Sequence, residues 1–179
     1  NKINNLRTLP NQIGPDLCIL SEHWGRKKHL KEALRSQHYK VIEYSRASSR
    51  VPYKCKKGKA AKINPTGGGC AIIYDEKNFD VTELNVDIPE GVEATWAILT
   101  PKVNEIMKYN KILVGAIYIA PRTEYKPEAV SHIIETMQCM QAKYENQLGQ
   151  IITGDFNRTD ISDILDSDGS LMQVCSVAT

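Results

Sequence analysis

The sequence predicts an α/β (α+β) protein in which mixed or antiparallel sheets are flanked by outer helices. Apolar residues recur at helical spacing near the start of the chain and again over residues 127–148. From residue 68 to residue 119, several strand-like segments follow one another without a helix. This order favours mixed or antiparallel sheets with outer helices over a doubly wound parallel sheet. The 179 residues contain neither a repeat nor a linker, so we expect one domain over 1–179.

The first third of the chain is expected to form two helices and two strands. Residues 1–14 carry one apolar stripe that Gly14-Pro15 ends, which is typical of a helix. Asp16–Leu20 is a short apolar strand. Helical spacing returns over Arg26–His38, and Tyr39–Ser45 is strand-like.

The middle of the chain is expected to begin with a loop and continue as strands. Residues 46–66 have no hydrophobic period and are rich in Ser, Lys and Gly, which indicates a loop. Gly68–Tyr74 is a strand, and Phe79–Val86 alternates as its hairpin partner or neighbour. Val92–Leu99 and Lys111–Ile119 are two further strands.

The last third is expected to hold the longest helix. Pro127 suits the first turn of a helix over Pro127–Leu148, and Gly149 suits the position just after it. Ile151 and Ile152 form the next strand, and a short helix follows around Ile161–Leu165.

Charge and cysteine content exclude some classes of protein. There are 23 Lys and Arg against 21 Asp and Glu, a formal charge of +2, so a nucleic-acid partner has to be met by a local basic patch. The cysteine count is odd, at five, with no C-x-x-C pair, which favours a reducing compartment, the nucleus or cytoplasm. No apolar run approaches the length of a membrane span.

Two apolar strands end in carboxylates. Asp16–Leu20 runs into Ser21-Glu22-His23-Trp24, and Ile151-Ile152 runs into Thr153-Gly154-Asp155-Phe156-Asn157. Alternation along the second strand turns Phe156 to the core and places Asp155 and Asn157 at its mouth. Gly154 lets another backbone or a ligand come close.

Paired carboxylates of this kind indicate a cation. Glu22 and Asp155 follow two interior strands and can share one mouth of the sheet. At such a mouth the two carboxylates repel each other unless a positive charge lies between or beside them. Hard oxygen ligands with open positions suit Mg²⁺, with Mn²⁺ as an alternative. The chemistry that this arrangement predicts is metal-assisted hydrolysis of a phosphoester.

Each of these residues also has a plain structural interpretation. Asp155 and Asn157 are common turn residues, and Glu22 alone is an ordinary loop acid. His23 beside a Trp is more typical of packing or a surface contact than of a catalytic base. The acidic residues Asp160, Asp163, Asp166 and Asp168 lack the EF-hand spacing and indicate a solvated helix face.

A basic segment precedes the Gly-rich strand. Its cations are Arg46, Arg50, Lys54, Lys56, Lys57, Lys59 and Lys62. Lysines act as point charges on a phosphate backbone and position DNA without reading its sequence. Tyr53 in the same segment offers an aromatic ring on which a base could stack. The alternative is a solvated charge run with no partner.

Taken in order, the motifs resemble the endonuclease/exonuclease/phosphatase family, and within it the endonuclease domain of LINE-type (non-LTR) retrotransposons. The matching pieces are N-K-I-N-N-L-R-T-L, D-L-C-I-L-S-E-H-W, G-G-G-C-A-I-I-Y, V-G-A-I-Y-I-A-P, I-I-T-G-D-F-N and L-M-Q-V-C-S-V-A-T. The resemblance covers nearly the whole chain. It implies a DNase-I-like fold, which is a two-sheet β-sandwich flanked by helices, with the basic segment as a loop on the substrate side.

The resemblance also implies a role for each site residue. Asp155 is expected to orient and deprotonate the attacking water, and Asn157 to bind a phosphate oxygen or steady a histidine. Glu22 is expected to bind Mg²⁺, and Tyr118 to offer its hydroxyl to the phosphate. Tyr118 also has a structural interpretation, as a core tyrosine with one wet end.

Two motifs of the family are not found in this sequence. The family carries an Asn on a strand before the first helix and a late Ser-Asp-His, and neither matches here. We therefore expect a partial domain, incomplete at both ends and inactive alone, that continues into a reverse transcriptase. The alternatives are a phosphatase-type enzyme of the same fold acting on a small phosphorylated substrate, and a non-catalytic DNA-binding remnant.

Overall fold

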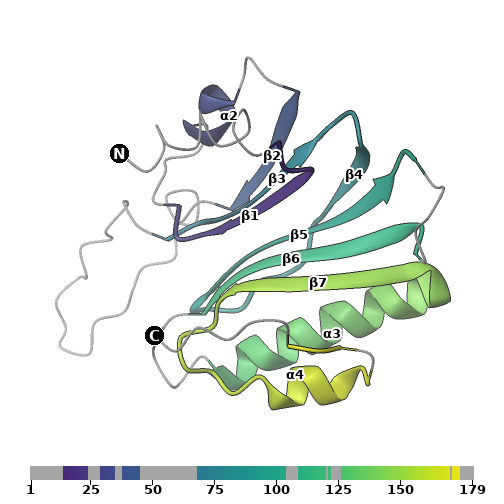
Figure 1. Ribbon diagram of the computed structural model, residues 1–179. Coiled ribbons are helices and arrows are strands. Elements are labelled where there is room, and N and C mark those ends of the chain that lie inside the picture. The colour runs from purple at the N-terminus through teal and green to yellow at the C-terminus, as the bar shows by residue number, and fades with distance from the viewer. Residues whose placement is uncertain are drawn as a thin grey trace, which may run out of the picture.

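The computed structural model describes residues 14–23, 29–34, 38–44, 68–103, 109–119, 121, 126–169 and 171–173. The predicted helix over 1–14, except its last residue, and the basic segment with all seven of its cations lie outside these residues. Within the described part, two sheets pack face to face, with helices on their outer sides (Figure 1). The predicted fold class, a two-sheet sandwich flanked by helices, is confirmed.

The first sheet is small and antiparallel. Its strands are β1 (Leu17–Ser21), β2 (Tyr39–Tyr44) and β3 (Cys70–Asp75), in the order β1-β3-β2. A short helix, α2 (His29–Ala33), packs against its outer face, where Leu30 is fully buried in a cluster with residues of β2 and β3. This first sheet is called sheet A below.

The second sheet, sheet B, has four strands and one parallel pair. They are β4 (Phe79–Leu84), β5 (Val92–Pro101), β6 (Lys111–Ile119) and β7 (Leu148–Asp155), in that order. The pair β6–β7 is parallel because the helix α3 (Lys126–Tyr144) crosses back between them. A 3-10 turn, η3 (Glu145–Gln147), precedes β7, and the helix α4 (Ser162–Ser167) follows it.

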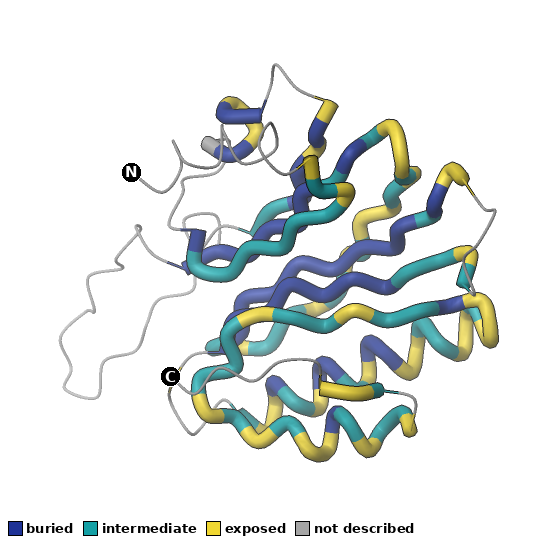
Figure 2. The backbone as a smooth tube through the Cα atoms, in the orientation of Figure 1, coloured by how far each residue is buried: buried dark blue, intermediate teal, exposed yellow. Residues whose placement is uncertain are grey.

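The sandwich has one core between the sheets and another beneath α3. Strand β5 serves both, because its side chains alternate between the two faces. Ala97 and Leu99 pack toward sheet A, whereas Trp96 and Ile98 pack in the cluster that contains Ile133 of α3. The central strands of sheet B are accordingly the most buried part of the chain (Figure 2).

Two sequence predictions about connections are wrong. Strand β4 is not the hairpin partner of β3, because the turn at Glu76–Asn78 carries the chain from sheet A to sheet B, where β4 pairs with β5. The long helix ends at Tyr144, and Gly149 is a strand residue, because β7 already begins at Leu148 opposite Lys111. Leu148 packs in the same core cluster as the apolar residues of the helix. Its position in the sequence continues their helical spacing, which explains why the predicted helix was too long.

Two further expectations concern membranes and thiols. Among the described helices, none is long and apolar enough to span a membrane. The cysteines of the described part, Cys18, Cys70 and Cys139, are free thiols.

Candidate active site

One end of the sandwich collects the strand ends that carry the predicted residues. The ladders place the last residues of β1, β2, β4, β6 and β7 and the first residues of β3 and β5 at this end. Hydrogen bonds join the two sheets here: the Thr95 hydroxyl donates to the Cys70 carbonyl at 3.3 Å, and the Cys70 thiol donates to the Glu93 carbonyl at 3.4 Å. We call this end the rim below.

Glu22, Tyr118 and Asp155 are brought to the rim by three different strands. Glu22 directly follows β1, which packs against both β6 and β7. Tyr118 and Asp155 are partners in the parallel β6–β7 ladder. The side chain of Tyr118 is buried in the core between the sheets, while Glu22 and Asp155 are half-buried.

The segment Gly154–Asn157 is shaped by close backbone contacts. A Cβ on Gly154 would collide with the carbonyl oxygen of Ile117, and Gly154 has φ +151°. The sequence predicted that a backbone or a ligand comes close to Gly154, and in the structure it is the backbone of β6 that does so. The strand ends at Asp155, and Phe156 packs against the core beneath α3 as expected. Asn157 then turns with φ +44°.

Asn157 remains tied to the rim although it lies beyond the strand. Its side-chain amide donates to the carbonyl of Ile119 at 2.9 Å, at the end of β6. Its backbone N–H donates to the carboxylate of Asp155 at 3.0 Å. These two bonds fix Asn157 and one oxygen of Asp155 relative to β6 and β7.

Two residues that the sequence did not assign to the site complete the rim. His23 is buried, and its backbone N–H donates to the Gly69 carbonyl at 3.3 Å. Glu93 is also buried, and its carboxylate accepts the backbone N–H of Gly69. Glu93 lies opposite Tyr118 in the β5–β6 ladder, so it connects the Glu22 side of the rim with the Asp155 side.

His23 is therefore a packed residue at the rim. Burial lowers its pKa below the usual range of histidine, while the Tyr44 carbonyl and the carboxylates of Glu43 and Glu93 oppose that shift. The neutral ring donates from Nε2 to the Tyr44 carbonyl at 3.4 Å. The sequence interpretation of His23 as a packing residue agrees with this position.

The rim fits a cation that retains water. It offers the half-buried carboxylates of Glu22 and Asp155, but in the described ranges no group of three or more His, Cys, Asp and Glu side chains is arranged to hold a metal. Mg²⁺ is commonly bound through one or two carboxylates, with waters and substrate phosphate oxygens as its other ligands. The donor set is thus compatible with Mg²⁺ and unlike a closed structural site.

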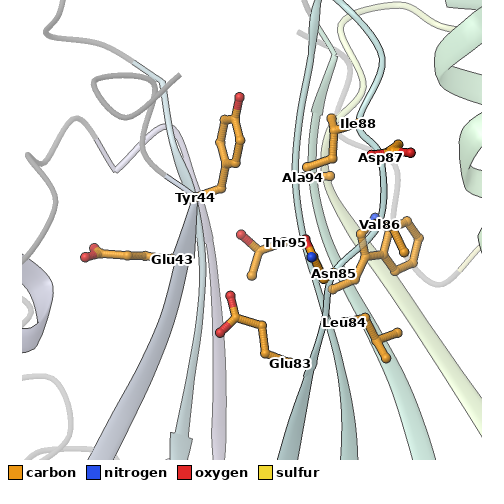
Figure 3. Close-up of a pocket in the computed structure, with 11 residues that line it drawn as sticks. Glu43, Tyr44, Glu83, Leu84, Asn85, Val86, Asp87, Ile88, Ala94 and Thr95 are labelled. Carbon is orange, nitrogen blue, oxygen red and sulfur yellow. The ribbon is translucent and has the colours of Figure 1, made fainter. Parts of the chain in front are cut away.

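A cleft opens beside the rim between the free edges of the two sheets (Figure 3). It measures about 340 Å³ and is bordered by the ends of β2 and β4 and by the start of β5. Glu83 and Thr95 point into the gap, whereas Glu43 points to the outer side of sheet A. The cleft is adjacent to the predicted site residues but is not lined by them.

The acidic run near the end of the chain lies on α4 and beside it. Asp160, Asp163 and Asp166 are exposed on or just before α4. Asp160 accepts the backbone N–H of Ser162 at 3.0 Å and its hydroxyl at 2.7 Å, and these bonds lower its pKa. Asp168 accepts the side-chain amide of Gln150 at 3.0 Å.

The fold is DNase-I-like and matches that of endonuclease/exonuclease/phosphatase proteins. Solved structures of this fold include the human Nocturnin catalytic domain with a bound sulfate (TM-score 0.61, 17% identity) and a family member from Bacteroides thetaiotaomicron (0.59, 17%). ANGEL2, a 2′,3′-cyclic phosphatase in complex with adenosine-2′,3′-vanadate, matches with a TM-score of 0.57 and 18% identity. No protein-family model and no curated protein sequence matches the chain.

The present chain corresponds to only part of these proteins. The matches cover 94%, 87% and 86% of this chain but 61%, 53% and 43% of Nocturnin, the Bacteroides protein and ANGEL2. At identities below 20%, the likeness establishes the fold. The reaction and the substrate have to be argued from the residues of the rim.

Proposed function

We propose that this chain contributes to a metal-dependent phosphodiesterase, the DNA-nicking endonuclease domain of a retrotransposon polyprotein. The observation that carries the proposal is the convergence of Glu22, Tyr118 and Asp155 at one rim from β1, β6 and β7. The ordered resemblance to LINE-type endonucleases supports the substrate, and the fold of the structural neighbours supports the reaction class.

Each rim residue has a chemical role in this proposal. Asp155 orients the attacking water and accepts its proton, and its bond to the backbone N–H of Asn157 holds the carboxylate for that step. Tyr118 presents a hydroxyl to the phosphate, and Asn157 helps to position that phosphate. Glu22 would hold Mg²⁺, with Mn²⁺ as a substitute; when bound, the metal supplies positive charge that stabilises the phosphate and the leaving oxygen.

DNA binding is assigned to the basic segment. Residues 45–67 join Tyr44 to Gly68, and both of these flanking residues lie at the rim. Because the segment joins the sandwich at this end, its lysines and arginines would attract a phosphate backbone toward the rim that carries Glu22 and Asp155. The rest of the proposal, an intracellular protein continuous with a reverse transcriptase, rests on the resemblance to LINE-type elements.

A plasmid-nicking assay with the full-length protein tests the proposal. Supercoiled plasmid with Mg²⁺ is incubated with wild type, Glu22→Ala and Asp155→Ala, and the loss of supercoiled DNA is followed on gels. We expect each substitution to slow nicking at least about 100-fold. Asp163→Ala removes an exposed acid on α4 and should nick like the wild type.

Nicking, phosphatase and DNA-binding assays on the same proteins separate the alternatives. Nicking that survives both substitutions would refute the site. Hydrolysis of a small phosphomonoester or cyclic phosphate, without nicking, would favour the phosphatase-type enzyme, which the likeness to ANGEL2 supports. DNA binding without either activity would favour the non-catalytic remnant. A longer reading frame with Ser-Asp-His and a reverse transcriptase would support the retrotransposon context.

A further inference from the structure

His23, the residue that follows Glu22, is held by hydrogen bonds from its backbone and from its ring. His23 has an exposed fraction of 5%, and it makes hydrogen bonds to residues far away in the sequence. Its backbone N–H donates to the Gly69 carbonyl at 3.3 Å, and its ring Nε2 donates to the Tyr44 carbonyl at 3.4 Å. His23 thus fastens the end of β1 to the end of β2 and to the start of β3.

Gly69 packs directly against this ring. A Cβ at Gly69 would overlap Nε2 of His23 and lie 2.8 Å from Cε1 and 2.9 Å from Cδ2. Its φ of +92° also belongs to a region that L residues rarely adopt. Glycine at this position therefore permits both the turn into β3 and the burial of the imidazole ring.

Glu93 extends the arrangement to the other sheet. Its carboxylate accepts the N–H of Gly69, whose carbonyl accepts the N–H of His23. Because Glu93 belongs to β5, these bonds connect sheet A with sheet B at the rim. Glu93 is also the ladder partner of Tyr118, so the connection leads to the second group of site residues.

Glu22 needs such support because of its backbone. It has φ +51°, a conformation that is sparsely populated for residues other than glycine and persists where the surroundings impose it. Among the described strands, β1 lies at the edge of sheet A and pairs only with β3, so Glu22 follows a strand with a single ladder partner. The bonds of His23 hold the peptide between Glu22 and His23, and with it the direction in which the Cα–Cβ bond of Glu22 leaves the backbone.

We propose that His23 is a positioning residue for Glu22, which it holds in a metal-binding orientation through its bonds to Gly69 and Tyr44. This inference rests on the proposed function of Glu22. His23 touches neither substrate nor metal in this assignment, and Glu93 supports it by fixing Gly69. Loss of a residue that orients a metal ligand typically weakens metal affinity about 10- to 100-fold.

Mn²⁺ binding to the full-length protein tests the proposal without relying on activity. Free Mn²⁺ is measured by electron paramagnetic resonance during titration, and the Mn²⁺ bound by wild type but not by Glu22→Gln defines the site. His23→Ala should weaken this binding about 10- to 100-fold. His23→Gln keeps an N–H that reaches the Tyr44 carbonyl and should bind within about threefold of wild type.

His132→Ala is the matched control, because it removes an equally buried imidazole from α3, on the other face of sheet B. It should leave Mn²⁺ affinity unchanged. Circular dichroism confirms that each variant is folded at the temperature used. If His23→Ala does not fold, His23→Leu fills the site without donating a hydrogen bond and should show the same loss.

The outcomes distinguish this proposal from the proposed function. If Glu22→Gln binds Mn²⁺ like the wild type, the metal site is wrong and the role of His23 is lost with it. If Glu22→Gln loses the ion but His23→Ala and His23→Leu bind it normally, only the positioning role is overturned. Equal losses in His23→Ala and His23→Gln would also overturn it, because the hydrogen bond would then be irrelevant.

Discussion

Tyr118 of β6 lies directly opposite Asp155 of β7 in a parallel ladder. Partners in a parallel pair turn their side chains to the same face of the sheet, which here is the face toward sheet A. The phenol and the carboxylate therefore come from neighbouring strands at the same level of the sandwich. If both act on one phosphate, as proposed, they act as a unit and not as two independent contributors.

Substitution of the pair should reveal this dependence. Tyr118→Phe removes one donor at the reacting centre and should slow nicking about 100-fold, and Asp155→Asn should slow it about 1000-fold. The double variant should be no slower than Asp155→Asn within about threefold, because groups that act together lose their effect together. Single-turnover nicking of a supercoiled plasmid measures all three rates.

Tyr74→Phe provides the control for the loss of a phenol hydroxyl. Tyr74 also packs against the core between the sheets, but it lies near the opposite end of sheet A, where it pairs with Leu17. Its substitution should leave the rate unchanged. Strictly multiplicative effects of Tyr118→Phe and Asp155→Asn would show that the two side chains serve different steps.

Gly154 should be nearly irreplaceable. In Gly154→Ala the new Cβ meets the carbonyl oxygen of Ile117, and the backbone is already at φ +151°. Backbone strain and overpacking together should lower the free energy of unfolding by about 2 to 4 kcal/mol. Urea denaturation followed by circular dichroism measures the change.

Gly169→Ala is the matched substitution, because Gly169 is exposed and a Cβ there meets no atom within 4 Å. Its unfolding free energy should differ from that of wild type by less than about 0.5 kcal/mol. Equal stability of the Gly154→Ala and Gly169→Ala proteins would mean that β6 and β7 do not approach each other as described.

Local patterns were sufficient to predict the strand ends that form the rim. Alternation around Gly154–Asn157 correctly turned Phe156 to the core, and the apolar run before Glu22 located β1 to within one residue. Both predictions depend on neighbours in the chain, whose side-chain directions follow from the strand period.

The cross-sheet contacts were not predictable in the same way. Glu93 binds a residue 24 positions away, and His23 binds one 21 positions away, so no period connects them. The available signal for Glu93 was an acid in the strand V-E-A-T-W-A-I-L-T, on the same alternating face as Thr95 and Ala97. The passage of the chain from sheet A to sheet B after β3 was not predicted, because alternation identifies a strand but does not say which strand pairs with it.

His132 should make stability depend on pH. The indole N–H of Trp96 donates to Nε2 of His132 at 3.2 Å, which requires a neutral ring. Burial lowers the pKa of His132 below 6.5, although the carboxylate of Glu135 opposes this; Asp87 and Glu128 border the same surface cleft. As the pH falls, the unfolded chain takes up the proton on His132 before the folded protein does. The contribution of His132 to stability is therefore constant above about pH 6.5 and falls as the pH drops below about 6.5.

The comparison with His132→Gln isolates this contribution. Glutamine can still accept the indole N–H, but it does not titrate. Between pH 7 and pH 5, the unfolding free energy of wild type should fall more steeply than that of His132→Gln, by at most about 1.4 kcal/mol per pH unit. The buried His23 is present in both proteins, so its contribution cancels. Parallel pH profiles would contradict the assignment.

The basic segment should bind DNA through phosphates alone. Replacement of Lys56, Lys57 and Lys59 by Gln should weaken binding to any duplex and lower the slope of log K against log salt by about 0.9 for each phosphate that is no longer neutralised. Fluorescence anisotropy between about 50 and 200 mM KCl, the range over which phosphate binding weakens steeply, measures the slope. Because phosphates carry no sequence information, two unrelated duplexes should show the same decrease in affinity.

Three exposed lysines at the opposite end of the sandwich form the matched control. Lys40, Lys77 and Lys102 lie at the start of β2, in the turn after β3 and just after β5. The ion pairs of Lys40 with Glu76 and of Lys102 with Asp80 are on the surface, so their loss should change stability little. The triple Gln variant has the same net charge as the first. If it lowers the salt slope equally, DNA is held by overall charge, and the basic segment has no special role.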